Sequence, residues 1–105
     1  MKVNPDAMKK QAGKAHLLLA AMANETRLLI LCQLIDRERS VGEIAELLDA
    51  RQSTISQHLA LLRKDGFVQA RREGQTQFYS LKGEDARSVI EARHALYCVP
   101  ASRKK

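Results

Sequence analysis

The sequence predicts a mainly α-helical domain with a β-hairpin wing, in the winged helix-turn-helix order α-α-α-α-β-β-α. Two observations predict this class. Two amphipathic helices joined by a short turn are expected at about residues 40–64, and two strands around a glycine are expected at about residues 67–81. The apolar residues recur at helical spacing in the first stretch and at alternate positions in the second. We expect one domain over residues 1–105.

Further helices are predicted on both sides of this unit. Apolar residues at intervals of three and four indicate a first helix at about residues 7–22. Asn24 is a suitable cap for ETRLLILCQLI, whose many apolar residues predict a buried helix. A last helix is expected at about residues 84–98, before Pro100. The helix-turn-helix and hairpin can form a compact unit without the terminal helices, so we expect these helices to form a dimer interface.

The helix-turn-helix has clear boundary signals. Ser40 and Glu43 have the spacing of a capping box at the start of SVGEIAELL. The second helix, QSTISQHLALLRK, is expected to end at Asp65-Gly66, because glycine readily adopts the left-handed conformation of a C-cap. A helical projection of QSTISQHLALLRK separates two faces. The inward face holds Ile55, Leu59 and Leu62, and the outward face holds Ser53, Gln57, Ala60 and Lys64.

The outward face of the second helix favours binding of double-stranded DNA. The major groove accepts one α-helix, and in this motif the second helix enters it. Serine, threonine and glutamine side chains can bond base edges or phosphates. The alternative is an ordinary solvated face, as any surface helix has. His58 lies at the edge of the inward face and is expected to orient the helix or to bond a phosphate.

The hairpin weighs against that alternative. In FVQARREGQTQFYSL, Gly74 is placed for a tight turn, and Arg71-Arg72-Glu73-Gly74-Gln75 is expected to form a cationic tip. Arginines on a wing beside a recognition helix can hold phosphates or enter a minor groove. The predicted DNA-binding residues are therefore Gln52, Ser53, Thr54, Ser56, Gln57, His58, Lys64, Arg71, Arg72 and Gln75.

Composition agrees with a nucleic-acid partner. The formal net charge is +6, and residues 51–82 hold six Lys and Arg against two Asp and Glu. Basicity alone also suits RNA or an anionic membrane. Two Phe, two Tyr and no Trp argue against an RNA-stacking surface. No signal peptide or membrane-spanning run is evident, so a cytoplasmic protein is expected.

The motifs resemble those of the ArsR/SmtB family of bacterial dimeric winged-helix repressors over nearly the whole chain. MANETRLLILCQL resembles the family's second helix, and QSTISQHLALLRKDGFV with RREGQTQFYSL resembles its recognition helix and wing. The resemblance implies a homodimeric repressor on an inverted-repeat operator. Arg51 departs from the pattern, because relatives usually have a capping serine there. Asp49 or Ser53 is expected to supply the cap instead.

A metal-sensing role is disfavoured by the residues. The chain has no CxC or CxxC motif, VGEIAEL carries no thiol, and the last helix lacks the spaced Asp and His set of zinc-sensing relatives. We therefore expect no metal site and no cofactor. A metal-responsive repressor with a site not evident in the sequence remains the alternative.

The two cysteines resemble those of the persulfide-responsive branch of the family, which includes BigR and SqrR. Cys32 stands in LLILC and Cys98 in LYC. The resemblance implies that a disulfide or polysulfide link within one subunit releases DNA in response to reactive sulfur species or oxidants. The alternative is a buried core cysteine and an incidental thiol. A thiol oxidoreductase is less favoured, because the cysteines are far apart in sequence. No motif indicates an enzyme.

Overall fold

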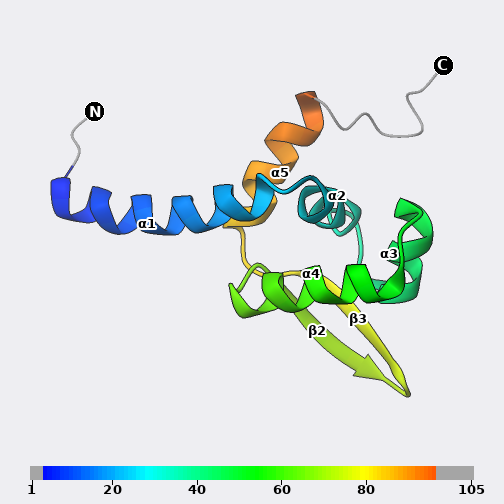
Figure 1. The fold of residues 1–105 in the computed structure, drawn as a ribbon. Coiled ribbons are helices and arrows are strands. Elements are labelled where there is room, and N and C mark those ends of the chain that lie inside the picture. The colour runs from blue at the N-terminus through cyan, green and yellow to red at the C-terminus, as the bar shows by residue number, and fades with distance from the viewer. Residues whose placement is uncertain (1–3, 97–105) are drawn as a thin grey trace.

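The computed structural model describes residues 4–96 and has the winged helix-turn-helix architecture (Figure 1). The sequence prediction of this class is confirmed, and so are its helices and two long strands. The structure adds one short strand, β1. In chain order the elements are α1 (Pro5–Met22), α2 (Glu25–Gln33), β1 (Arg39–Ser40), α3 (Val41–Leu48), α4 (Gln52–Lys64), β2 (Val68–Glu73), β3 (Thr76–Leu81) and α5 (Asp85–Leu96).

The three strands form one antiparallel sheet in the order β1-β3-β2. β1 pairs Arg39 with Tyr79 and Ser40 with Phe78. The register of β2 against β3 runs from Val68 opposite Leu81 to a tight turn at Gly74, whose φ is 64°. The sheet therefore ties the base of the wing to the residues that lead into α3.

The helix boundaries follow from local caps. The Asn24 side chain accepts a hydrogen bond from the Arg27 amide at 3.0 Å, so the predicted cap of α2 is confirmed. The Ser40–Glu43 capping box of α3 is also confirmed. Gly66, with a φ of 85°, follows the end of α4 as expected. α1 begins two residues before its predicted start, because Asn4 caps it. The predicted end of the last helix at residue 98 lies outside the described residues.

The expected cap of α4 is wrong. The N-cap is Arg51, and no side chain accepts a hydrogen bond from the first-turn amides. Asp49 has a φ of 53° and instead forms the C-cap of α3, while Ser53 already lies within α4. The short connection needs Asp49 in the left-handed conformation to end one helix, so its side chain does not cap the next.

The hydrophobic core lies between α2, α3, α4 and the sheet, with α5 covering one side. The predicted inward face of α4 is confirmed, since Ile55, Leu59 and Leu62 are fully buried. From α5, Ala86 and Ile90 reach the same core. The other large side chains that are fully buried are Ile30, Leu31, Leu34, Ile44 and Val68.

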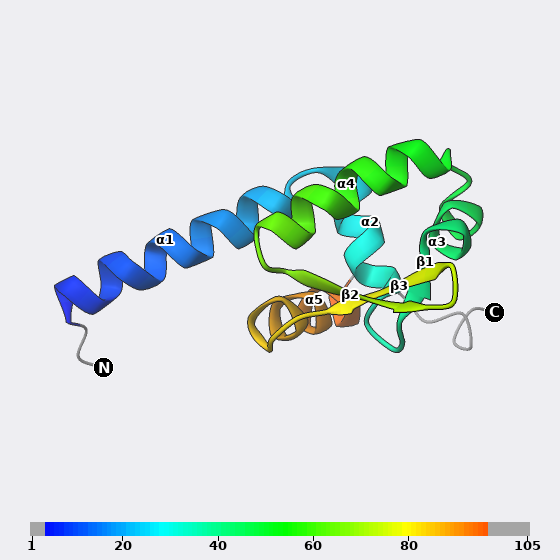
Figure 2. The ribbon, with the colours of Figure 1, turned by 90° about the horizontal axis from the view of Figure 1, so that it is seen from below.

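α1 extends away from this core (Figures 1 and 2). Only its last turns are buried, through Leu18, Ala21 and Met22. No single helix in the described part of the chain is long and apolar enough to cross a membrane. α1 and α2 together reach that length and composition, but they are bent by 96° at their junction.

Candidate nucleic-acid interface

α4 lies on the surface beside the projecting hairpin, and Figure 2 views the molecule from this side. The buried residues of α4 hold it against the core, so its opposite face is fixed toward solvent. On that face Ser53, Ser56 and Gln57 are exposed, as the sequence predicted, and Lys64 is exposed in the last turn. The helix therefore presents uncharged hydrogen-bonding groups near its N-terminus and basic groups at its C-terminus.

Two other predicted DNA-binding residues at the start of α4 have different surroundings. The amide end of Gln52 lies over α3, where a Cβ on Gly42 would be 3.5 Å from the Gln52 Nε2 atom. Thr54 is half-buried at the edge of the helix. Gln52 therefore contributes to the close approach of α3 and α4, and Ser53, Ser56 and Gln57 form the more open part of the face.

His58 faces inward more than outward. Its Nδ1 atom is buried and has no hydrogen-bond partner among the residues that the structure describes. Burial, and secondarily the charge of Arg27, lower the pKa of His58 below its usual value. The buried Nδ1 atom favours the predicted role of orienting α4.

The two wing arginines point to opposite faces of the hairpin. Arg72 lies opposite Gln77, on the face shared by Val68 and Leu81, because residues at alternate positions share one face of a strand. Arg71 lies opposite Phe78 on the other face. Both arginines belong to β2, so the tip itself consists of Gly74 and Gln75.

Arg71 is engaged within the protein. Its Nε atom donates to both carboxylate oxygens of Glu38, at 2.9 and 3.0 Å, and Nη2 also bonds this carboxylate. Nη1 donates to Glu73 Oε1 at 2.9 Å, and the guanidinium carbon lies 5.0 Å from the centre of the Phe78 ring. Arg71 lowers the pKa of Glu38, chiefly through these hydrogen bonds, and its own pKa is raised in turn.

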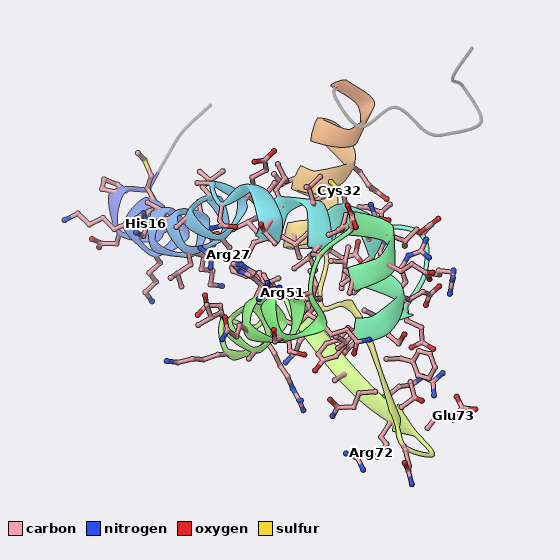
Figure 3. All side chains as sticks on the ribbon, turned by 45° about the vertical axis from the view of Figure 1, so that its right-hand side comes forward. His16, Arg27, Cys32, Arg51, Arg72 and Glu73 are labelled. Carbon is pink, nitrogen blue, oxygen red and sulfur yellow. The ribbon has the colours of Figure 1, made fainter. Side chains whose placement is uncertain are left out.

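Arg72 differs sharply from its neighbour. It is exposed and makes no hydrogen bond or ion pair with any described residue. Figure 3 shows Arg72 and Glu73 near the end of the wing, pointing to different sides. Arg72 is therefore the wing cation that is available to a ligand.

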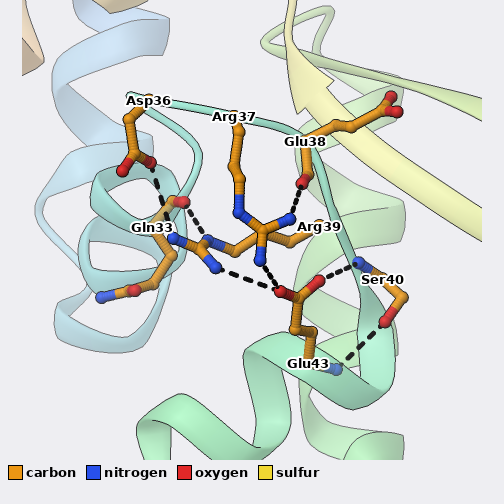
Figure 4. A network of polar contacts seen from close by, with 7 residues as sticks. All are labelled: Gln33, Asp36, Arg37, Glu38, Arg39, Ser40 and Glu43. Carbon is orange, nitrogen blue, oxygen red and sulfur yellow. Dashed lines mark hydrogen bonds and ion pairs between the residues drawn. The ribbon is translucent and has the colours of Figure 1, made fainter.

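A second polar network supports the start of α3 (Figure 4). Glu43 accepts from the Ser40 amide at 3.4 Å and pairs with Arg37 and with Arg39 Nη1, the latter at 3.2 Å. Burial tends to raise the pKa of Glu43, but the Ser40 amide and the two arginines outweigh it and lower the pKa. Arg39 Nε also donates to the Gln33 carbonyl at 2.7 Å, so the network joins α2 to α3.

Sequence reasoning missed Arg37, Glu38 and Arg39. The capping-box spacing identified Ser40 and Glu43, but no local pattern pairs Glu38 with Arg71, which lies far along the chain. Their proximity depends on the pairing of β1 with β3. Only the alternation of charge in DRER between two helices offered a weak signal.

Cys32 lies on α2 and is half-buried against the core. α2 packs against α5. The start of α5 is tied to the end of α2 by Arg87, whose Nη1 atom donates to the Ile35 carbonyl at 2.7 Å. Cys98 lies outside the described residues. Within residues 4–96, no group of three or more His, Cys, Asp and Glu side chains could hold a metal ion.

The fold and this surface define a winged helix-turn-helix DNA-binding protein. Residues 24–70 match the model described as bacterial regulatory protein, arsR family. The transcriptional activator HlyU of Vibrio cholerae is 52% identical, covering 91% of this chain and 89% of that protein. The biofilm growth-associated repressor of Agrobacterium fabrum is 44% identical, covering 90% of this chain and 80% of that protein. The chain belongs to the ArsR family.

Solved structures agree with this assignment. Reduced HlyU from Vibrio cholerae is 53% identical and superposes with a TM-score of 0.84, covering 89% of this chain and 98% of that one. BigR from Xylella fastidiosa is 32% identical, with a TM-score of 0.81 over 93% of this chain and all of that one. A homodimeric winged helix-turn-helix fragment from Mycobacterium bovis is 32% identical, with a TM-score of 0.75 over 91% and 89% of the two chains. The protein is a DNA-binding transcription regulator.

Proposed function

We propose that the chain is a homodimeric repressor that binds an inverted-repeat operator in its dithiol form and is released when Cys32 and Cys98 become linked. The observation that carries the DNA-binding part is the exposed face of α4, which places Ser53, Ser56 and Gln57 on a rigid surface helix. The names of relatives include both a repressor and an activator, so a reporter assay must decide the sign of regulation.

Apolar side chains on the terminal helices support dimerisation. Met8, Leu17 and Leu19 of α1 and Val89 of α5 are between 37% and 58% exposed. Leu17, Leu18 and Val89 also line a groove between α1 and α5. In a small domain, a helix face with several exposed apolar side chains is typical of a surface that is buried in an oligomer. The related fragment from Mycobacterium bovis is homodimeric, which agrees with this arrangement.

The proposed DNA contacts divide by chemistry. The polar residues of the first turns of α4 read base edges or bond nearby phosphates, while Lys64 and Arg72 bind phosphates. His58 holds α4 in place from its inner side. The proposed contact residues are Gln52, Ser53, Thr54, Ser56, Gln57, Lys64, Arg72 and Gln75; Arg71 is treated separately below.

Selection from a random duplex library tests the DNA-binding proposal. The reduced protein should enrich an inverted repeat whose half-sites are one helical turn apart or a multiple of it. Gln57→Ala should then cost roughly 1–3 kcal/mol on the selected operator and relax the preference at one position in each half-site. Ala60→Ser is the matched control, because it changes a residue on the same exposed face without removing a polar group. No enrichment, or an unchanged preference in Gln57→Ala, would contradict the assignment of α4.

The proposed switch rests on the packing of α2 with α5. Cys32 is half-buried and lies at the edge of the core. α5 is anchored to α2 at its start through Arg87 and Ile35, and Cys98 follows two residues after its last described residue. A solved structure of HlyU is of the reduced protein, and BigR is described as a transcriptional repressor. The reduced state named for HlyU supports a redox role for this chain.

The chemistry balances with a low-molecular-weight persulfide as oxidant. The thiolate of one cysteine attacks the outer sulfur of the persulfide, which forms a cysteine persulfide and releases the parent thiol. The second thiolate then attacks the cysteine-bound sulfur and expels hydrosulfide, leaving a disulfide. The persulfide sulfur is reduced and the two thiols are oxidised. Each further sulfur transferred before closure lengthens the bridge by one atom, which relaxes the short Cα separation that a direct disulfide needs.

Single cysteine substitutions test the switch. Cys32→Ser and Cys98→Ser should bind the operator as the reduced wild type does, and neither should be released by glutathione persulfide. Crosslinking needs to disfavour the DNA-bound geometry by only ~1–3 kcal/mol to act as a regulator. Release of either mutant to the wild-type extent would contradict the two-cysteine mechanism. Release of the reduced wild type by added metal would instead support the metal-responsive alternative.

A further inference from the structure

We propose that Arg71 is a positioning residue of the wing, held by Glu38, and that it does not bind DNA itself. This inference goes beyond the family function, because it separates two adjacent arginines by role. It rests on DNA binding by the family and not on the proposed thiol switch. Both arginines are predicted DNA contacts from the sequence, but their surroundings in the folded protein differ.

The guanidinium of Arg71 is occupied on three sides. Glu38 accepts hydrogen bonds from Nε and Nη2, Glu73 accepts one from Nη1, and the ring of Phe78 packs on one face. A bidentate arginine–carboxylate pair is the same fork that would bind a phosphate. A phosphate at Arg71 would have to displace Glu38 from this fork or use the two remaining N–H groups, and in either case it would approach the carboxylates of Glu38 and Glu73.

Glu38 links the wing to the start of α3. It directly precedes β1, and Ser40 at the end of β1 caps α3. In Figure 4 the Glu38 side chain points away from the Glu43 network, whereas its carbonyl accepts from Arg37 Nη1 at 3.2 Å. The Glu38–Arg71 pair thus connects the start of α3 with the middle of β2. Because α3 packs on α4, this connection fixes Arg72, the next residue of β2, relative to the recognition helix.

The inference predicts how charge contributes to affinity. Arg71 together with Glu38 and Glu73 has no net positive charge, so Arg72 supplies the wing's phosphate contact. Each phosphate contact changes the slope of log K against log salt by about 0.9. A dimer contains two wings, so loss of Arg72 should reduce the slope by about 1.8, and loss of Arg71 should reduce it by less.

A double-mutant cycle on the full-length reduced protein and its selected operator tests this role. Glu38→Gln and Arg71→Gln should each lower affinity by about two- to fivefold, the range of an exposed ion pair. The double variant, which keeps the net charge of the wild type, should lose no more than either single variant, because both changes break one connection. In the Arg72→Gln background, Glu38→Gln should cost little further affinity, because the Glu38–Arg71 pair acts by positioning Arg72.

The salt dependence supplies the readout that a general loss of stability would not change. If Arg71→Gln lowers the slope as much as Arg72→Gln does, Arg71 is a phosphate contact and the proposal is wrong. It is also wrong if Arg71→Gln costs as much in the Glu38→Gln background as in the wild type. Should Arg71→Gln lose the hairpin, Glu38→Gln still decides the question: it must lower operator affinity, and unchanged or higher affinity overturns the proposal.

Discussion

The uncapped start of α4 predicts that one substitution will stabilise the protein. Arg51 occupies the N-cap with φ −74° and ψ 142°, the extended conformation that a capping residue needs, yet it offers no acceptor to the first-turn amides. In Arg51→Ser the hydroxyl can accept from the amide of Ser53 or Thr54 without a change of backbone. Ser40 makes the corresponding bond at α3, where its Oγ atom accepts from Glu43 N at 3.1 Å.

The expected gain is about 1 kcal/mol in the free energy of unfolding. Capping serines contribute about 0.5–2 kcal/mol relative to alanine. The upper end is not expected here, because Gln52 and Ser53 are exposed and an exposed first turn leaves its amides open to water. For a domain of this size, about 1 kcal/mol corresponds to a rise in Tm of roughly 4–8 °C.

Thermal and urea unfolding of the reduced protein without DNA should measure this gain. Protein concentration must be the same for all variants, because dimerisation shifts apparent stability. Arg51→Ala is the matched control, since it removes the same charge and supplies no acceptor. Arg51→Ser should be more stable than both the wild type and Arg51→Ala. Equal stability of the serine and alanine variants would refute the reasoning about the cap.

Three other predictions concern the stability of the folded domain. Leu59→Ala should reduce the free energy of unfolding by about 2–5 kcal/mol in urea titrations, because Leu59 is fully buried; a loss below about 1 kcal/mol would contradict its place in the core. Ser40→Ala should cost about 1 kcal/mol by removing half of the capping box, whereas Ser56→Ala on the exposed face of α4 should change stability little. The lowered pKa of His58 means that the unfolded chain binds the proton more readily than the folded protein does. Stability should therefore fall as the pH decreases below the usual histidine pKa of about 6.5, and this part of the loss should be absent in His58→Gln.

The elements predicted from sequence were those set by local patterns. Apolar spacing identified Ile55, Leu59 and Leu62 as the buried face of α4, and cap spacing placed the starts of α2 and α3. These features depend on residues within a few positions of one another, so local sequence patterns predict them.

Most features that sequence reasoning missed depend on distant partners, and one depends on a competing local requirement. β1 consists of two residues, and its pairing with Phe78 and Tyr79 defines it as a strand. The surroundings of Arg71 and Arg72 differ because strand alternation places them on opposite faces, only one of which meets Glu38. The cap of α4 was mispredicted because Asp49 is needed to end α3. The predicted link between the cysteines involves Cys98, outside the described residues, and it stays a prediction.

The most direct test of the account follows one sample of the wild-type protein through a cycle of oxidation and reduction. Fluorescence anisotropy reports occupancy of the selected operator, and intact mass reports the state of the two thiols at each stage. The reduced protein should bind. Glutathione persulfide should release it as each subunit loses two hydrogens and gains one sulfur for every atom inserted in the link, and a thiol reductant should restore both mass and binding. Continued operator binding by the fully linked protein would contradict the account.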